Sequence, residues 1–358
     1  MSPINIAQQR LINQHIGVTP FATPHEVVKW LVASQAQDYA GAKWALGLRL
    51  RQDMHDADID RAFNEGSILR THVLRPTWHF VTPADIRWLL ALTAPRVHAA
   101  NTTMYRKLEL DSATLKRGHK AMTKALQGGQ HLTRDELRAT LEKAGIAADN
   151  GQRLAYIVMQ AELDGVICSG PRRGKQFTYA LLEEWVPPVA SLQRDEALAT
   201  LTRRYFTGHG PATVQDLVKW SGLTIADARR SLEAVKNKLQ HDTLNGEDYW
   251  FASALPDRTP TSTAYLLSVY DEYLIGYTDR RLIAEPEIAA KLFTMGNALT
   301  AVVVVDGRIV GSWRRTLNKE AVTIEINPFR SLTKAEQRAV IAAVNQYSEF
   351  LEKPVTLI

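Results

Sequence analysis

Apolar and polar positions along the chain repeat one order: a helix, a tight turn, a second helix and then two short strands. The stretch "TVQDLVKWSGLTIADARRSLEAV" shows this order most clearly, because its apolar positions recur every three or four residues on both sides of the turn Ser221-Gly222. The strands follow in "LQHDTLNGEDYWFA", where Asn245-Gly246 is a strong signal for a two-residue hairpin turn. This order predicts a winged helix-turn-helix unit.

The same order occurs twice upstream. "LTRDELRATLEKAGI" begins with a capping box from Thr133 to Glu136, and "NGQRLAYIVMQAELDG" predicts a second helix before the hairpin "VICSGPRRGKQFTYALL". A weaker copy lies near the N-terminus, with helices expected near 6–14 and 24–33 and strands in "ILRTHVLRPTWHFV". We therefore expect three tandem winged helices.

The C-terminal part of the chain has a different pattern. "ALTAVVVVDGRIVGSWRR" and "AVTIEINPF" predict strands, with Asp306-Gly307 as a two-residue turn, and a closing helix is expected from about 333 to 351. The predicted fold class is α+β: tandem winged helix-turn-helix units with a C-terminal β-rich segment and a closing helix. We expect these units to occupy residues 1–105, 106–188, 189–255 and 256–358.

Length and composition indicate a folded protein of several compact units, since 45% of its 358 residues are hydrophobic and 23% are charged. No apolar run reaches the roughly 18 residues of a membrane span, and "MSPINIAQQR" begins as a polar helix without a signal-peptide core. We therefore expect an intracellular protein of the cytoplasm. The single cysteine, Cys168, excludes an internal disulfide and predicts a buried strand thiol.

A net charge of +5 is compatible with an acidic polymer as partner, and the positions of the basic residues matter more than their number. Candidate phosphate contacts lie at the tip of the second hairpin, on the second helix of the third unit, beside Trp78 and after "DEYLIGY": Arg172, Arg173, Lys175, Arg229, Arg230, Arg75, Arg280 and Arg281. The tip Asp306-Gly307-Arg308 is a further candidate, because an exposed hairpin that ends in Arg can enter a minor groove. The alternatives are a solvated basic face, a structural turn and, around Asp271 and Glu272, an aromatic core with a salt-bridged rim.

Motifs for metal, nucleotide or nucleophile chemistry do not occur in the sequence. We find no H-E-x-x-H, P-loop, Rossmann fingerprint or G-x-S-x-G elbow. His79 is a candidate acid or base, but its place in a strand between Trp78 and Phe80 favours a packing role. We therefore expect neither a metal nor an organic cofactor.

The stretch "LVASQAQDYAGAKW" places Gln35 and Gln37 where an apolar helix is expected to stop, after a start marked by Thr23 and Glu26. On a helix the two glutamine side chains would diverge by about 200°, whereas in an extended segment residues i and i+2 point the same way. The pair converges only if the helix has ended. The alternative is two polar residues at a solvated helix end.

Four stretches, "SQAQD", "LRPTWHFV", "DEYLIGYTDRR" and "VVVVDGRIVGSW", occur in an order that resembles the winged-helix DNA glycosylases of the AlkZ/YcaQ type. The resemblance covers essentially the whole chain. It implies a concave DNA-binding body of tandem winged helices that excises alkylated purines without a metal or organic cofactor. It also implies that Gln35-Ala36-Gln37 is the catalytic motif, in the glutamine form of AlkZ-like enzymes that unhook interstrand crosslinks. Asp306-Gly307-Arg308 is similar to the family's DNA-probing hairpin.

Two glutamines limit the chemistry that we expect. A glutamine is a poor general base, but its amide can hold and orient a water molecule. A purine alkylated at N7 is already cationic and leaves readily, so positioning and oriented dipoles supply what remains. We expect a monofunctional glycosylase that acts on double-stranded DNA as a monomer and leaves an abasic site. The alternative is a winged-helix transcriptional regulator whose helices read base edges.

Overall fold

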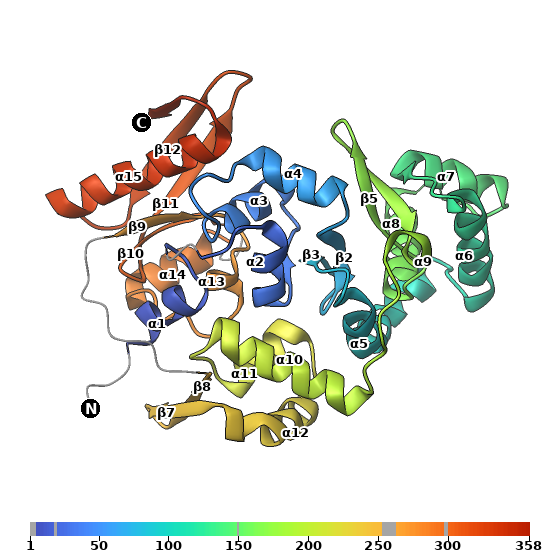
Figure 1. Ribbon diagram of the computed structural model, residues 1–358, viewed down its shortest axis with the longest axis horizontal. Coiled ribbons are helices and arrows are strands. Elements are labelled where there is room, and N and C mark those ends of the chain that lie inside the picture. Colours follow the sequence, from blue (N-terminus) through green and yellow to red (C-terminus); the bar gives the residue numbers. More distant parts are fainter. Residues whose placement is uncertain (1–4, 18–19, 149, 253–262, 297–299) are drawn as a thin grey trace. The chain divides into compact units, whose positions relative to one another are not determined.

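The computed structural model describes residues 5–17, 20–148, 150–252, 263–296 and 300–358 (Figure 1). The chain forms two compact units. The first unit comprises residues 1–59, 199–220 and 224–358, and the second comprises residues 60–198 and 221–223. The expected segment 1–105 is divided between these units. The organisation into four segments and the winged-helix assignment stay predictions.

The first unit contains a five-stranded sheet in the order β13-β12-β11-β10-β9. Neighbouring strands are antiparallel except β12 and β13, which are parallel. The strands are β9 (Ala264–Leu267), β10 (Val302–Val305), β11 (Arg308–Leu317), β12 (Val322–Pro328) and β13 (Val355–Leu357). The long helix α15 (Lys334–Leu351) lies along this sheet (Figure 1). The Tyr347 ring contacts Trp44 and Trp313, with ring centroids 4.8 and 5.3 Å away.

The other elements of the first unit carry the N-terminal segment and the helices around it. They are α1 (Ile6–Asn13), α2 (Pro24–Leu31), β1 (Ser34–Gln35), α3 (Tyr39–Gly47), α11 (Val214–Ser221), α12 (Ile225–Val235), the 3-10 turn η1 (Lys236–Lys238), β7 (Gln240–Leu244), β8 (Glu247–Phe251), α13 (Glu272–Ile275) and α14 (Pro286–Thr294). Three helices run across a unit boundary in the sequence: α4 (Asp56–Asn64), α10 (Arg194–His209) and α11, whose last residue Ser221 belongs to the second unit.

The second unit has its own core, formed by α6, α7, α8 and a small sheet in the order β4-β6-β5. Its elements are β2 (Leu69–Val73), β3 (Thr77–Val81), α5 (Ile86–Lys107), α6 (Ser112–Leu126), β4 (Leu132–Thr133), α7 (Arg134–Lys143), α8 (Gly151–Leu163), β5 (Ile167–Arg173), β6 (Gln176–Leu181) and α9 (Leu182–Trp185). Met122, Leu137 and Ile157 are buried in this core. Cys168 is fully buried in β5, which confirms the expected strand thiol.

Local sequence rules predict the ends of several elements correctly. The capping box from Thr133 to Glu136 forms, and the closing helix begins after the N-cap residue Thr333. At the turn Asp306-Gly307 both residues have positive φ, 47° and 85°, as a two-residue hairpin turn requires. The mixed α+β class is confirmed. No helix among the described residues is long and apolar enough to cross a membrane.

Candidate active site

Helix α2 ends abruptly two residues earlier than expected, just before the two glutamines. Its start is as predicted, with a capping box between Thr23 and Glu26, but the helix stops at Leu31. Val32 has φ 70° and ψ −51°, a γ-turn conformation that is rare and strained, above all for a β-branched side chain. The Val32 side chain is fully buried, so surrounding contacts hold the turn. The prediction that the helix ends before Gln35 is confirmed.

The glutamine motif runs from the interior to the surface within three residues. Gln35 is only 7% exposed and Ala36 is fully buried, whereas Gln37 is exposed. Asp38 then acts as the N-cap of α3, and its Oδ1 accepts a hydrogen bond from the backbone N–H of Gly41 at 3.1 Å. The convergence of the two glutamine amides stays a prediction.

A buried carboxylate binds the backbone of the motif. Glu272, 1% exposed, accepts a hydrogen bond at Oε1 from the backbone N–H of Gln35, at 2.9 Å. Its Oε2 accepts from Trp220 Nε1 at 2.8 Å and lies 3.2 Å from His209 Nε2. Side chains from α10 and α11 therefore contact the Glu272 carboxylate of α13, which in turn binds the backbone of Gln35. The sequence around Glu272 predicts only an aromatic core with a salt-bridged rim, because no local pattern signals a contact across 237 residues.

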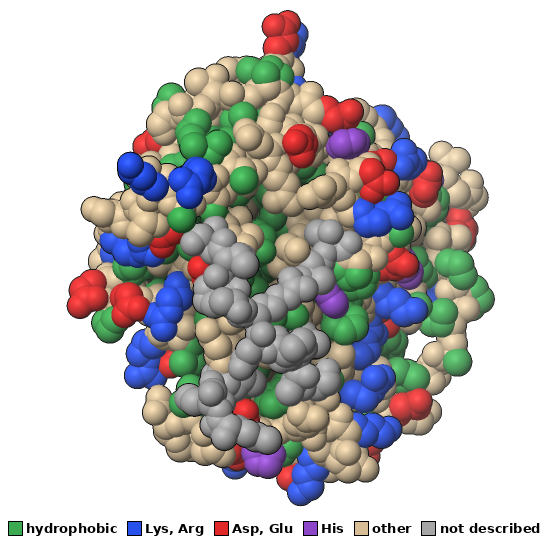
Figure 2. All heavy atoms as spheres, turned by 60° about the vertical axis from the view of Figure 1, so that its left-hand side comes forward, with side chains coloured by type: hydrophobic (Ala, Val, Ile, Leu, Met, Phe, Trp, Pro, Cys, Tyr) green, Lys and Arg blue, Asp and Glu red, His purple; other side chains and the backbone are tan. Residues whose placement is uncertain are grey.

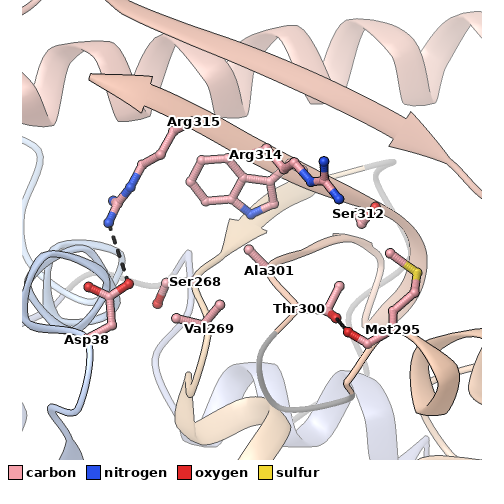
Figure 3. Close-up of a pocket in the computed structure, with 10 residues that line it drawn as sticks. Asp38, Ser268, Val269, Met295, Thr300, Ala301, Ser312, Arg314 and Arg315 are labelled. Carbon is pink, nitrogen blue, oxygen red and sulfur yellow. Dashed lines mark hydrogen bonds and ion pairs between the residues drawn. The ribbon is translucent and has the colours of Figure 1, made fainter. Parts of the chain in front are cut away.

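The first unit contains a pocket of about 450 Å³ that is lined in part by Asp38, the residue that follows the motif in the sequence. Figure 3 shows its lining. Its residues are Asp38, Ser268, Val269, Met295, Thr300, Ala301, Ser312, Trp313, Arg314 and Arg315. Arg315 Nη2 lies 3.9 Å from Asp38 Oδ2 across the pocket. The buried hydroxyl of Ser268 has no hydrogen-bond partner among the described residues. This pocket offers cationic, hydroxyl and aromatic groups to a polar ligand.

The tip of the β5–β6 hairpin holds three cations in different environments. Arg172 is partly buried and pairs with Asp60, with Nη1 and Oδ1 3.1 Å apart. Arg173 is more exposed and pairs with Glu136 at 2.7 Å. The backbone N–H of Thr133 and then Arg173 lower the pKa of Glu136 to about 2, so this pair stays charged at neutral pH. Lys175 is exposed in the turn.

The other basic candidates lie apart along the chain. Arg229 and Arg230 are exposed on α12, with Arg230 3.5 Å from Asp227. Arg281 is also exposed and forms a bidentate pair with Asp279. Arg75 and Arg280 are half-buried, and burial lowers the pKa of Arg280 from its usual value. On the face drawn in Figure 2, the described Lys and Arg side chains are interspersed with Asp and Glu.

The turn at Asp306-Gly307 is packed at Gly307 and exposed at Arg308. Gly307 is buried: its carbonyl accepts a hydrogen bond from the Tyr273 hydroxyl at 2.7 Å, and a Cβ at this position would lie 3.0 Å from the Ala7 backbone. Gly307 packs against α1, which agrees with the alternative of a structural turn. Arg308 alone is exposed there, and it pairs with Glu285.

His79 is fully buried in β3, and its Nδ1 lies 2.9 Å from the backbone oxygen of Thr77. This environment agrees with the packing role favoured by the sequence.

Comparisons with known proteins agree over nearly the whole chain. The family model "DNA glycosylase AlkZ-like" matches residues 28–350. The chain belongs to the AlkZ-like DNA glycosylase family. An "Interstrand DNA cross-link repair glycosylase" from Streptomyces sahachiroi is 27% identical over 340 residues, covering 88% of this chain and 87% of that protein. The solved structure of Streptomyces sahachiroi DNA glycosylase AlkZ superposes with a TM-score of 0.79 at 21% identity, covering 99% of this chain and 98% of the other.

Membership of the AlkZ-like family confirms the resemblance seen in the sequence and identifies the chain as a hydrolytic DNA glycosylase of DNA repair. Its substrate is DNA. The alternative of a transcriptional regulator is not supported. The assignment of individual residues to catalysis or DNA binding stays a proposal.

Proposed function

We propose that this AlkZ-like glycosylase hydrolyses the N-glycosidic bond of purines alkylated at N7, including purines joined in interstrand crosslinks, with Gln35 and Gln37 orienting the water. One observation carries the proposal: the carboxylates on either side of the motif are already engaged. Glu272 binds Gln35 N–H, Trp220 and His209, and Asp38 caps α3. Neither is well placed to serve as a general base.

An active site without a strong base selects a substrate that leaves easily. Alkylation at N7 puts positive charge on the purine, so bond cleavage neutralises the leaving group and needs little acid assistance. What remains is to hold a water against the sugar and to favour an oxocarbenium-like transition state, which oriented amide dipoles can do. An unmodified purine lacks this charge and is therefore expected to resist excision.

Crosslinks enter the proposal through the relative from Streptomyces sahachiroi, whose name gives interstrand cross-link repair. The exposed position of Gln37 supports the same conclusion, because a bulky adduct can approach an exposed amide without entering a closed cavity. We further propose that the enzyme acts as a monomer on DNA in the nucleoid and leaves an abasic site.

The function is tested by incubating the enzyme with a duplex that contains one N7-methylguanine and then cleaving abasic sites with alkali. We expect strand breaks at the modified guanine well above spontaneous depurination, and none in a matched duplex of unmodified guanine. Strand breaks in the absence of alkali would contradict the monofunctional reaction. No excision above the enzyme-free control would overturn the proposed substrate.

We also propose that basic side chains, most of them exposed, contact the DNA backbone. The exposed candidates are Arg173, Lys175, Arg229, Arg230 and Arg281, with Arg308 as a minor-groove contact, and the half-buried candidates are Arg75 and Arg280. Arg172 contributes less because it is partly buried as well as paired with Asp60. Each phosphate contact steepens the dependence of log affinity on log salt by about 0.9 on duplex DNA.

Replacing Arg173 and Lys175 together by Ala is expected to reduce the slope of log affinity against log salt. The reduction should correspond to the loss of about two phosphate contacts. The affinity should fall similarly for duplexes of different sequence, because phosphates carry no sequence information. Measurements of the dissociation constant at several salt concentrations give the slope. Arg308→Ala is measured in the same way. Arg172→Ala is the matched control, for which we expect lower stability and little change in slope. An unchanged slope in the double variant would assign this hairpin to protein packing.

A further inference from the structure

We propose that Glu272 is a positioning residue of the glycosylase reaction: its carboxylate holds the backbone of Gln35 and so sets the orientation of the glutamine pair. The inference rests on the proposed role of Gln35 and Gln37.

The hydrogen bond between Glu272 and Gln35 is direct and buried. Glu272 Oε1 accepts the Gln35 N–H at 2.9 Å, and both residues are more than nine-tenths buried. Water therefore does not compete for this hydrogen bond. Its length is that of a well-formed N–H···O hydrogen bond.

The second oxygen of the carboxylate fixes the direction in which the first one points. Oε2 accepts from the indole of Trp220 at 2.8 Å and lies 3.2 Å from His209 Nε2. The His209 ring stacks on Tyr205, with centroids 4.8 Å apart and planes 13° apart. Trp220 and His209 are fully buried, so Glu272 has little freedom to rotate away from Gln35.

The backbone of Glu272 is also held on both sides. Asp271 before it forms a bidentate pair with the buried Arg49, with both N–O distances 3.0 Å. Tyr273 after it donates its hydroxyl hydrogen to the carbonyls of Ala7 and Gly307, at 3.0 and 2.7 Å. The carboxylate is therefore a rigid support for the segment that it contacts.

A rigid support matters here because the motif follows a strained turn. The positive φ of Val32 is costly, and such a backbone persists only where the surroundings over-determine it. A backbone N–H needs only a neutral acceptor, whereas burying an ionised carboxylate carries a large desolvation penalty. The use of a buried carboxylate at Gln35 is explained if the exact placement of the following amides controls the reaction.

Glu272→Gln tests this role with minimal change of shape. The amide keeps one acceptor oxygen, so its NH₂ group must face a donor, either the N–H of Gln35 or that of Trp220. We expect the single-turnover rate on N7-methylguanine duplex to fall about tenfold at saturating enzyme, with the dissociation constant for DNA nearly unchanged. A tenfold loss corresponds to about 1.4 kcal/mol of activation free energy.

A double-mutant cycle separates positioning from general destabilisation. If Glu272 acts through the glutamine pair, then adding Glu272→Gln to the variant Gln35→Ala/Gln37→Ala should cost almost nothing further, since both positioned side chains are already gone. Multiplicative losses in the combined variant would overturn the inference while leaving the role of Gln35 intact. A wild-type rate for Gln35→Ala would instead overturn the proposed glutamine mechanism, and this inference with it.

Asp216→Asn is the matched structural control. Asp216 is another buried carboxylate of the first unit, which accepts hydrogen bonds from Thr213 and Thr278 and does not contact the motif. We expect it to lower the melting temperature but to keep the rate per folded molecule. If Glu272→Gln does not fold, Glu272→Asp keeps the charge and shortens the side chain by one methylene, which breaks the contact with Gln35. A wild-type rate in either folded Glu272 variant would overturn the inference.

Discussion

Replacing Gln35 or Gln37 by Ala is expected to slow excision of N7-methylguanine about a hundredfold. The estimate follows from other enzymes, in which loss of a single oriented donor costs roughly 2.7–4 kcal/mol of transition-state stabilisation. The loss should occur in the single-turnover rate at saturating enzyme, because the amides act on the water and the developing charge. DNA affinity should hardly change, since neither side chain is charged.

The two variants differ in how cleanly they test the mechanism. Gln35 is 7% exposed, so truncation leaves a small cavity and should also lower the melting temperature. Gln37 is exposed, and its truncation should leave stability within about 0.5 kcal/mol of the wild type. A slow but fully stable Gln37→Ala is therefore the more decisive result. Wild-type rates in both variants would remove the pair from the mechanism and turn attention to Asp38.

Local patterns predict much of the fold because the physics of helix ends and hairpins is local. The end of α2 before Gln35 and the start of α15 after Thr333 depend on residues within one helical turn. The hairpin turns depend on two residues, of which Gly accepts positive φ without strain. Local rules predict the length of α5 less well. This helix continues through Pro95, a residue that normally ends or kinks a helix.

The support of the site could not be predicted, because its partners are far apart in the sequence. Gln35 meets Glu272 across 237 residues and Arg49 meets Asp271 across 222. Periodicity says which residues are buried but not which buried partners meet. The packed turn at Gly307 shows the same limit: the sequence gives the turn type correctly, whereas its burial depends on contacts with Ala7 and Tyr273.

Asp271→Ala is expected to have the largest effect on stability. Arg49 and Asp271 are both fully buried and form two charge-assisted hydrogen bonds of 3.0 Å. Removal of one partner of a buried ion pair leaves an uncompensated charge and typically costs about 3–5 kcal/mol. Asp271 also caps α13 by accepting the N–H of Tyr273 at 2.9 Å, which adds to the loss.

Chemical denaturation of the wild type and the variant measures this difference in the free energy of unfolding. Asp279→Ala is the matched control, because it removes a bidentate pair with Arg281, whose side chain is 81% exposed. For this exposed pair we expect a change of about 0–1 kcal/mol. A loss below about 1 kcal/mol for Asp271→Ala would show that the other acceptors of Arg49 suffice. Those acceptors are the carbonyls of Gln14 and Ala45 and the side-chain oxygen of Gln14.

The double variant Arg49→Met/Asp271→Leu tests the cause of the loss. It leaves no buried charge, and apolar replacements of a buried pair are often neutral or stabilising, so we expect it to regain much of the stability that Asp271→Ala loses. Its excision rate should nevertheless stay below that of the wild type, because Asp271 holds the backbone of the adjacent Glu272, which contacts Gln35. Recovery of stability without recovery of rate would separate the ion pair's contribution to folding from its contribution to placing the glutamine motif.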